Sequence, residues 1–215
     1  MQFCFDRTGF PLVDLPDLEV QVHLLPVSKV QLERFLMEPN EFDDAWYETL
    51  LRVHGRVSYR RFSENERERV FVGGILPLEA VAFAQWLGPD FRLPTVIEWR
   101  KVYKRMEQLP IEESTWHALL EACSAPAKDI LEQLRNQMCP HRWLELSLLT
   151  GGLVEWVVAE SATEQERYAG LGKPRRSFQP GVWNPLQDII RPVSLEQRVS
   201  YFGFRLVETK KRRNK

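Results

Sequence analysis

Three residues with metal-binding side chains, Cys123, Cys139 and His141, lie within one stretch of the sequence. Thiolate and imidazole groups are common zinc ligands, so this group is the best candidate for a metal site in the chain. A structural zinc site usually has four ligands with paired Cys-x-x-Cys spacing, and no fourth Cys or His lies nearby. Cys123 also falls on the apolar side of a helical pattern, where a thiol behaves as a small hydrophobe. We therefore predict no metal and no other cofactor.

Other patterns that carry chemistry do not occur in the sequence. It contains no Gly-x-Ser-x-Gly nucleophile motif, no Walker phosphate-binding loop and no dinucleotide-binding glycine pattern. The histidines His23, His54, His117 and His141 are isolated from one another, and we interpret each as a surface or core residue.

The composition indicates a globular protein and gives no sign of membrane or nucleic-acid binding. The 215 residues are 44% hydrophobic and 27% charged, which is enough apolar material for a sizeable core in one large domain or two small ones. The net charge of −1 gives no whole-molecule field that would attract nucleic acid or a membrane surface. Three widely spaced cysteines do not form a disulfide framework, and the first residues lack the pattern of a signal peptide. These features favour a cytoplasmic protein.

Hydrophobic periodicity predicts the elements that position these residues. Alternation over residues 1–25 indicates short strands, and Ser28 with Gln31 predicts a capping box at the start of a helix. Pro77 is suited to the first position of a further helix. We assign the inward face of that helix to Leu78, Val81, Ala82 and Trp86. Residues 107–140 carry two more helical patterns, which form either two helices or one bent one.

Three phrases stand out by their order and spacing. They are Trp86-Leu87-Gly88 followed by Arg92-Leu93-Pro94-Thr95-x-x-Glu98-Trp99, then Gly151-Gly152-Leu153-Val154-Glu155-Trp156, and finally Gly203-Phe204-Arg205. Together they resemble the formylglycine-generating-enzyme (sulfatase-modifying factor) family over residues 70–105 and 145–207. The resemblance implies an α+β fold, a variant of the C-type lectin fold with a small twisted antiparallel sheet, flanking helices and much irregular loop.

Within this resemblance the polar and aromatic residues of the phrases have structural roles. Pro94 forces its predecessor into an extended conformation, Thr95 caps the next helix together with Glu98, and Trp99 anchors that helix in the core. The planar guanidinium of Arg92 is suited to a carboxylate, and either Glu98 or Glu155 could be its partner. The complete set of predicted structural residues is Trp86, Arg92, Glu98, Trp99, Glu155, Trp156 and Arg205.

The chain differs from the family at the positions of the family's metal-binding residues. Its active members carry two cysteines that bind copper, and the matching positions here are Pro180 and Pro185. Proline offers neither a thiolate nor an N–H. The asparagine that serves among the family's calcium ligands is replaced by Gly152. The resemblance thus implies a pseudoenzyme, in which the scaffold of the family is present without its activity.

We predict one domain over residues 1–207 with a helical insert at about 107–140, and a basic flexible tail over 208–215. The leading hypothesis is a non-catalytic protein-binding or regulatory subunit of a bacterial multi-protein system, with a defence or CRISPR-type accessory set as one candidate setting. The expected partner is another protein in a hetero-complex, with no membrane and no nucleic acid. The expected partner-binding residues are Trp116, Arg175, Arg176, Phe178 and Trp183, because aromatic and Arg side chains dominate interfaces. The aromatic ones are equally suited to the core.

Two alternatives remain open at the level of sequence. One is a metal-dependent oxidase with a relocated site, and the other is a lectin-like ligand-binding receptor.

Overall fold

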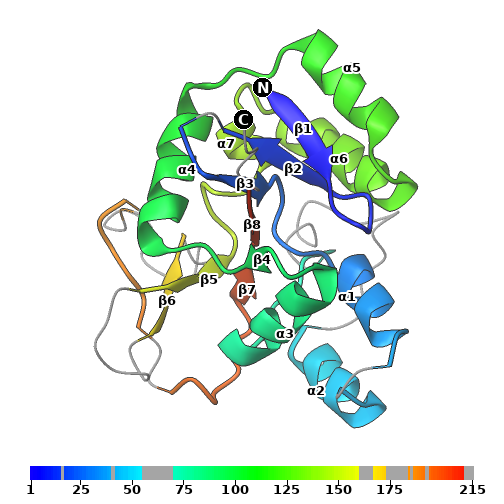
Figure 1. Cartoon of the computed structure of the whole chain (residues 1–215), viewed down its shortest axis with the longest axis vertical. Coiled ribbons are helices and arrows are strands. Elements are labelled where there is room, and N and C mark those ends of the chain that lie inside the picture. Colours follow the sequence, from blue (N-terminus) through cyan, green and yellow to red (C-terminus); the bar gives the residue numbers. More distant parts are fainter. Residues whose placement is uncertain are drawn as a thin grey trace.

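The computed structural model describes residues 1–15, 17–39, 42–54, 70–159, 167–172, 184, 186–191 and 194–210. Within these ranges the fold is α+β, with seven helices and two sheets (Figure 1). The helices are α1 Lys29–Leu36, α2 Asp44–His54, α3 Pro77–Leu87, α4 Val96–Gln108, α5 Glu113–Ala122, α6 Ala125–Met138 and α7 Trp143–Leu146. The strands are β1 Gln2–Phe5, β2 Pro11–Asp14, β3 Val20–His23, β4 Phe91–Arg92, β5 Val154–Val158, β6 Tyr168–Leu171, β7 Phe202–Phe204 and β8 Val207–Thr209.

The larger sheet joins the two ends of the chain. Its strand order is β1-β2-β3-β8-β4, and every neighbouring pair is antiparallel. The last strand therefore inserts beside β3, with Val207 opposite Val22. The smaller sheet has the order β6-β5-β7, in which β5 runs antiparallel to β6 and parallel to β7. Because β7 and β8 are separated by only Arg205 and Leu206, one short segment links the two sheets.

The predicted helix starts are confirmed at α1 and α4. Ser28 and Gln31 form a reciprocal capping box in which the side chain of Ser28 accepts from the Gln31 amide. Thr95 and Glu98 do the same at α4, whose buried residues are Trp99, Val102 and Met106. The N-termini of α1 and α4 are thus fixed by local hydrogen bonds that the sequence predicts.

The predicted inward face of α3 is wrong in part. Pro77 does occupy the first turn, but Leu78 is 71% exposed. The buried residues are Pro77, Ala80, Phe83, Ala84 and Leu87, which follow the helical spacing of three and four. The helix is apolar nearly all around, so its sequence does not define a single buried stripe, and tertiary packing selects the face.

Two apolar clusters form the core. The first packs β1–β3 against α4–α7, and the second packs α1 and α3 against β5 and β7. Residues 107–140, predicted as a helical insert, form the two separate helices α5 and α6. They add Trp116, Leu119 and Ile130 to the first cluster, so the insert is part of the main core.

Regular structure extends beyond the predicted domain boundary at residue 207. Strand β8 continues to Thr209, and the Lys210 amide donates to the Glu19 carbonyl at 3.0 Å. The Lys210 ammonium donates to the carbonyls of Leu15 and Leu18. Residues 208–210 therefore belong to the domain, and residues 211–215 of the predicted tail lie outside the described residues. None of the helices in the described ranges combines the length and apolar character needed to cross a bilayer.

Candidate functional site

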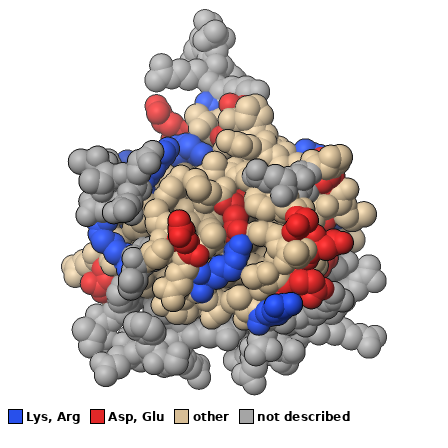
Figure 2. Space-filling model, turned by 90° about the horizontal axis from the view of Figure 1, so that it is seen from below, with Lys and Arg blue, Asp and Glu red and all other residues tan. Residues whose placement is uncertain are grey.

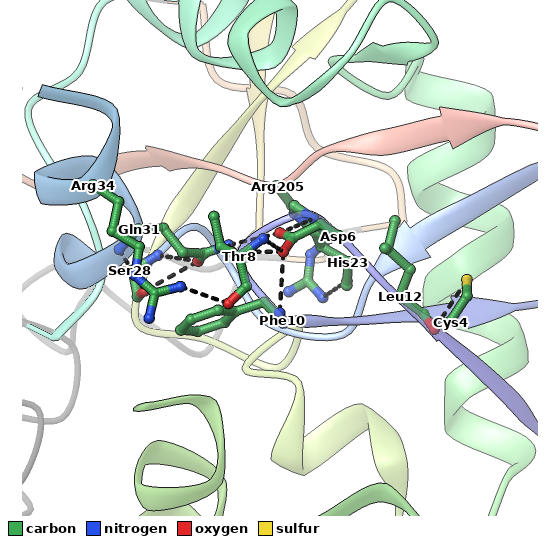
Figure 3. Close-up of polar contacts among 10 residues, drawn as sticks. All are labelled: Cys4, Asp6, Thr8, Phe10, Leu12, His23, Ser28, Gln31, Arg34 and Arg205. Carbon is green, nitrogen blue, oxygen red and sulfur yellow. Dashed lines mark hydrogen bonds and ion pairs between the residues drawn. The ribbon is translucent and has the colours of Figure 1, made fainter. Parts of the chain in front are cut away.

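Arg205 is the centre of a buried polar network that joins the two sheets. Its side chain is fully buried. The guanidinium donates to the carbonyls of His23 at 2.9 Å and Leu24 at 2.6 Å, at the end of β3, and to the Ser147 carbonyl at 2.6 Å, beside α7. Figure 3 shows it reaching toward the His23 region. Such multiple charge-assisted bonds fix β3 and α7 to the β7–β8 link.

Glu155 on β5 completes this network. It pairs with Arg205 through two bonds, Nε–Oε2 at 3.0 Å and Nη2–Oε1 at 2.8 Å, and it is 1% exposed. The Trp99 indole N–H donates to the same carboxylate at 2.8 Å, which attaches α4. The structure thus brings together three residues that the phrases place far apart in sequence. In the structure, Glu155 therefore pairs with Arg205 and not with Arg92.

Arg92 pairs with Glu98, one of the two partners that the sequence leaves open. The pair is bidentate, with Nη1–Oε2 at 2.8 Å and Nη2–Oε1 at 2.6 Å. Burial raises the pKa of Glu98, but the bonds from Arg92 and from the Thr95 amide and hydroxyl outweigh it, so this pKa is lowered. The side chains are 41% and 20% exposed, so this pair lies nearer to solvent than the Arg205 pair. It fastens the turn at Pro94 to the start of α4.

The two remaining tryptophans of the phrases also make internal bonds. The Trp156 indole donates to the Ile75 carbonyl at 2.7 Å and is 2% exposed. The Trp86 indole donates to Glu38 at 2.8 Å, with the guanidinium of Arg7 4.5 Å from its ring centre. Their polar groups are therefore satisfied within the protein, in keeping with the structural roles assigned from sequence.

A second buried polar cluster surrounds Asp6, and the sequence analysis did not identify it (Figure 3). The carboxylate accepts from the Thr8 amide and hydroxyl, from the Phe10 amide at 3.1 Å, and from the Gln31 side chain at 3.0 Å. His23 Nε2 lies 3.1 Å from Oδ2 of the same carboxylate. Burial raises the pKa of Asp6, but His23 and the other donors outweigh it and the pKa is lowered.

One sequence signal could have found the Asp6 cluster. Asp6 and Thr8 precede Gly9 between two strands, and an Asp that bonds an amide two residues ahead is a common turn device. The partners Gln31 and His23 come from other elements and carry no local signal. The cluster ties the β1–β2 turn to α1 and β3.

The calcium site of the family that the phrases resemble does not fit this arrangement. Both oxygens of Glu155 already accept from Arg205 and Trp99, so a calcium ion at this carboxylate would face the buried guanidinium. The family's cysteine positions, Pro180 and Pro185, lie outside the described residues. Over the part of the chain that the structure describes, no group of three or more His, Cys, Asp or Glu side chains converges in a way that could hold a metal ion.

Among the predicted partner-binding residues, only Trp116 is described. It is 4% exposed and packs in the first core cluster, with the Arg135 guanidinium 4.6 Å from its ring centre. The prediction of Trp116 as a surface anchor is therefore corrected to its core alternative, because the amphipathic face of α5 turns it inward. Arg175, Arg176, Phe178 and Trp183 lie outside the described residues.

Surface grooves lie beside two pairs of helices in the described part of the chain. One, of about 450 Å³, runs between α5 and α6 and is lined by Trp116, His117, Leu120, Glu121, Lys128, Glu132, Arg135 and Asn136. The other, of about 410 Å³, lies between α1 and α2 and is lined by Glu33, Leu36, Met37, Phe42, Asp43, Asp44 and Tyr47. The first has charges of both signs, whereas the charged side chains lining the second are all acidic.

Comparisons with known proteins find a likeness among solved structures but no match to a family. No protein-family model matches the chain, and no curated protein matches it. Among solved structures, the chain is similar to the crystal structure of CarF, with 16% sequence identity and a TM-score of 0.47. The alignment covers 98% of this chain and 97% of that one.

Proposed function

We propose that this protein is a non-catalytic, protein-binding or regulatory subunit of a bacterial multi-protein system. We further propose that its domain is a degenerate formylglycine-generating-enzyme-like variant of the C-type lectin fold. The observation that carries the proposal is the interior network in which Arg205, Glu155 and Trp99 bind one another. The polar groups of these three residues therefore bind one another inside the protein and stabilise the scaffold.

A catalytic group has to contact its substrate. Glu155 and Arg205 are almost completely buried, and every oxygen of Glu155 accepts a hydrogen bond from inside the protein. Arg92 and Glu98 satisfy each other in the same way at the start of α4. At the positions of the family's cysteines the sequence has Pro180 and Pro185, which cannot bind a soft metal ion. These residues favour a scaffold that serves recognition.

The α5–α6 groove, on the helical insert, is the surface within the described residues that we assign to a protein partner. Its floor includes Trp116 and Leu120, and its walls carry Glu121, Lys128 and Glu132. Rims with both charge signs around an apolar floor are typical of protein–protein contacts that discriminate between partners. We place the first contact of the subunit here.

Affinity purification of the tagged full chain from its native host, followed by mass spectrometry and metal analysis, tests the proposal. We expect a stoichiometric protein partner and no copper, iron or zinc. Glu121→Arg in the groove should reduce recovery of the partner. Glu107→Arg, which makes the same change at an exposed position of α4, should leave recovery unchanged. A protein recovered alone with a stoichiometric redox metal would overturn the proposal in favour of a metal-dependent oxidase.

A further inference from the structure

The groove between α1 and α2 has an apolar floor and an acidic rim. Leu36 and Phe42 are partly buried lining residues, Met37 lies at the edge, and Glu33, Asp43 and Asp44 are exposed at the rim. Its volume of about 410 Å³ lies within the usual range of ligand-binding clefts. Because the whole chain has a net charge of only −1, the negative character of this groove is local.

Met37 gives this groove an exposed apolar edge. It is 85% exposed, the highest value among the large apolar side chains of the described residues. Methionine is flexible and polarisable, and it recurs on protein surfaces that accept apolar side chains of varied shape. Met37 ends α1 as its C-cap residue, so a rigid helix presents it at the edge of the groove.

The acidic rim is held in place by the same helices. The Tyr47 hydroxyl donates to Glu33 at 2.8 Å, which orients this carboxylate across the groove from α2 to α1. Asp43 accepts from the Trp46 amide at 2.8 Å and so caps α2 beside Asp44. In Figure 2, which views the end of the molecule formed by α1–α3, acidic side chains gather on the side where α1 and α2 lie.

We propose that this groove docks a short amphipathic segment of a partner protein in which Lys or Arg residues flank apolar anchors. This inference rests on the proposed function and names the chemistry of a second contact. The apolar anchors would pack on Met37 and Leu36, and the cations would meet Glu33 and Asp44 at the rim. Docking an amphipathic helix into a groove between helices is a recurrent mode of peptide recognition. Figure 1 places α2 and α5 at opposite ends of the long axis, so the two grooves suit contacts with two components.

The test uses the full chain and a fluorescein-labelled peptide of Leu and Lys of about 16 residues, which is roughly 24 Å long as a helix. Fluorescence anisotropy should show micromolar binding. Raising the salt from about 0.05 M to about 0.3 M should weaken it, because exposed charges are screened. A matched peptide with Glu in place of each Lys should not bind.

Two pairs of variants locate the binding. Met37→Lys should weaken binding about ten-fold or more, because it replaces an apolar anchor with a repelling charge. Leu78→Lys makes the same change at another exposed apolar residue, 71% exposed on α3, and should leave binding within about two-fold of the wild type. The double variant Glu33→Gln and Asp44→Asn should also weaken binding and flatten its salt dependence. The double variant Glu121→Gln and Glu132→Gln in the other groove should not.

Several results would overturn the inference. They are an absence of binding, equal binding of the Lys and Glu peptides, and equal effects of Met37→Lys and Leu78→Lys. A protein that dimerises through this groove, shown by sedimentation of the wild type and Met37→Lys, would assign the groove to a second copy instead. A native partner that Met37→Lys retains and Glu121→Arg loses would refute the second contact while leaving the proposed subunit function intact. The absence of any native partner would count against the proposed function itself.

Discussion

Replacing Arg205 by methionine tests whether the buried network holds the scaffold together. Methionine has similar length and fits an apolar site, so the change removes the charge with little change of volume. It leaves the Glu155 carboxylate 1% exposed with only the Trp99 indole as a donor. It also removes the donors to the carbonyls of His23, Leu24 and Ser147.

The expected loss in the free energy of unfolding is about 3–5 kcal/mol, the usual result of breaking a buried ion pair from one side. The loss of the donors to the three carbonyls should add to this value. Each buried acceptor that is left without a donor costs about 1 kcal/mol or more. A domain of this size is commonly stable by about 5–15 kcal/mol, so the variant should fold but unfold at much lower urea concentration.

Urea unfolding followed by tryptophan fluorescence measures this loss, with Arg92→Met as the matched control. Arg92 makes a bidentate pair of the same chemistry, but its side chain is 41% exposed and that of Glu98 is 20% exposed. Pairs of this exposure contribute about 1 kcal/mol or less. The same substitution should therefore be several times more damaging at Arg205 than at Arg92.

A double variant with Glu155→Met separates the ion pair from the rest of the network. In Arg205→Met, the Glu155 carboxylate is left charged and without its guanidinium partner. The double variant should therefore lose less free energy of unfolding than the sum of the losses in the two single variants. The reasoning is refuted if Arg205→Met costs no more than Arg92→Met, or if the two changes at Arg205 and Glu155 are simply additive.

Three further predictions follow from single sites. Gly9→Ala should destabilise by about 1–3 kcal/mol in the same urea assay, because Gly9 has φ of +77° and a Cβ there would lie 2.6 Å from that of Ser124. Asp6 has a folded-state pKa below its ordinary 3.8, so its stabilisation is present above that pH and lost as the pH falls through the folded value. The acid limb of a pH–stability curve should be shallower in Asp6→Asn, and an unchanged limb would contradict this assignment. Burial raises the pKa of Cys4 to about 11, so alkylation at pH 8 followed by mass spectrometry should label the exposed Cys139 well before Cys4.

Local signals in the sequence predict local structure well. The capping boxes at Ser28 and Thr95 each depend on two residues three positions apart, and both are present as predicted. Pro77 begins α3 for the same kind of reason, since its missing N–H is harmless in the first turn. Where one turn of chain contains all the interacting groups, their spacing is enough to predict the contact.

Contacts between distant elements are harder to predict. Arg92 could pair with Glu98 or Glu155, and only the positions of β5 and β7 decide, because they bring Arg205 to Glu155. Leu78 and Trp116 show the same difficulty for burial. Each has an apolar side chain on a helix, yet packing leaves one at 71% exposure and the other at 4%.

The interior network is buried, whereas the residues at the rims of the grooves are exposed. This difference in burial explains why the family-like phrases indicate a scaffold but do not identify a partner. Arg205, Glu155 and Trp99 depend on one another through buried bonds, so changing any one of them costs several kcal/mol whether or not a reaction takes place. Foldability alone is therefore sufficient to keep these residues in a chain without catalytic cysteines. Met37 and Asp44 bear no such constraint, since exposed side chains contribute little to stability. In the proposed docking groove, the identities of these two residues can therefore follow the partner at little cost in stability.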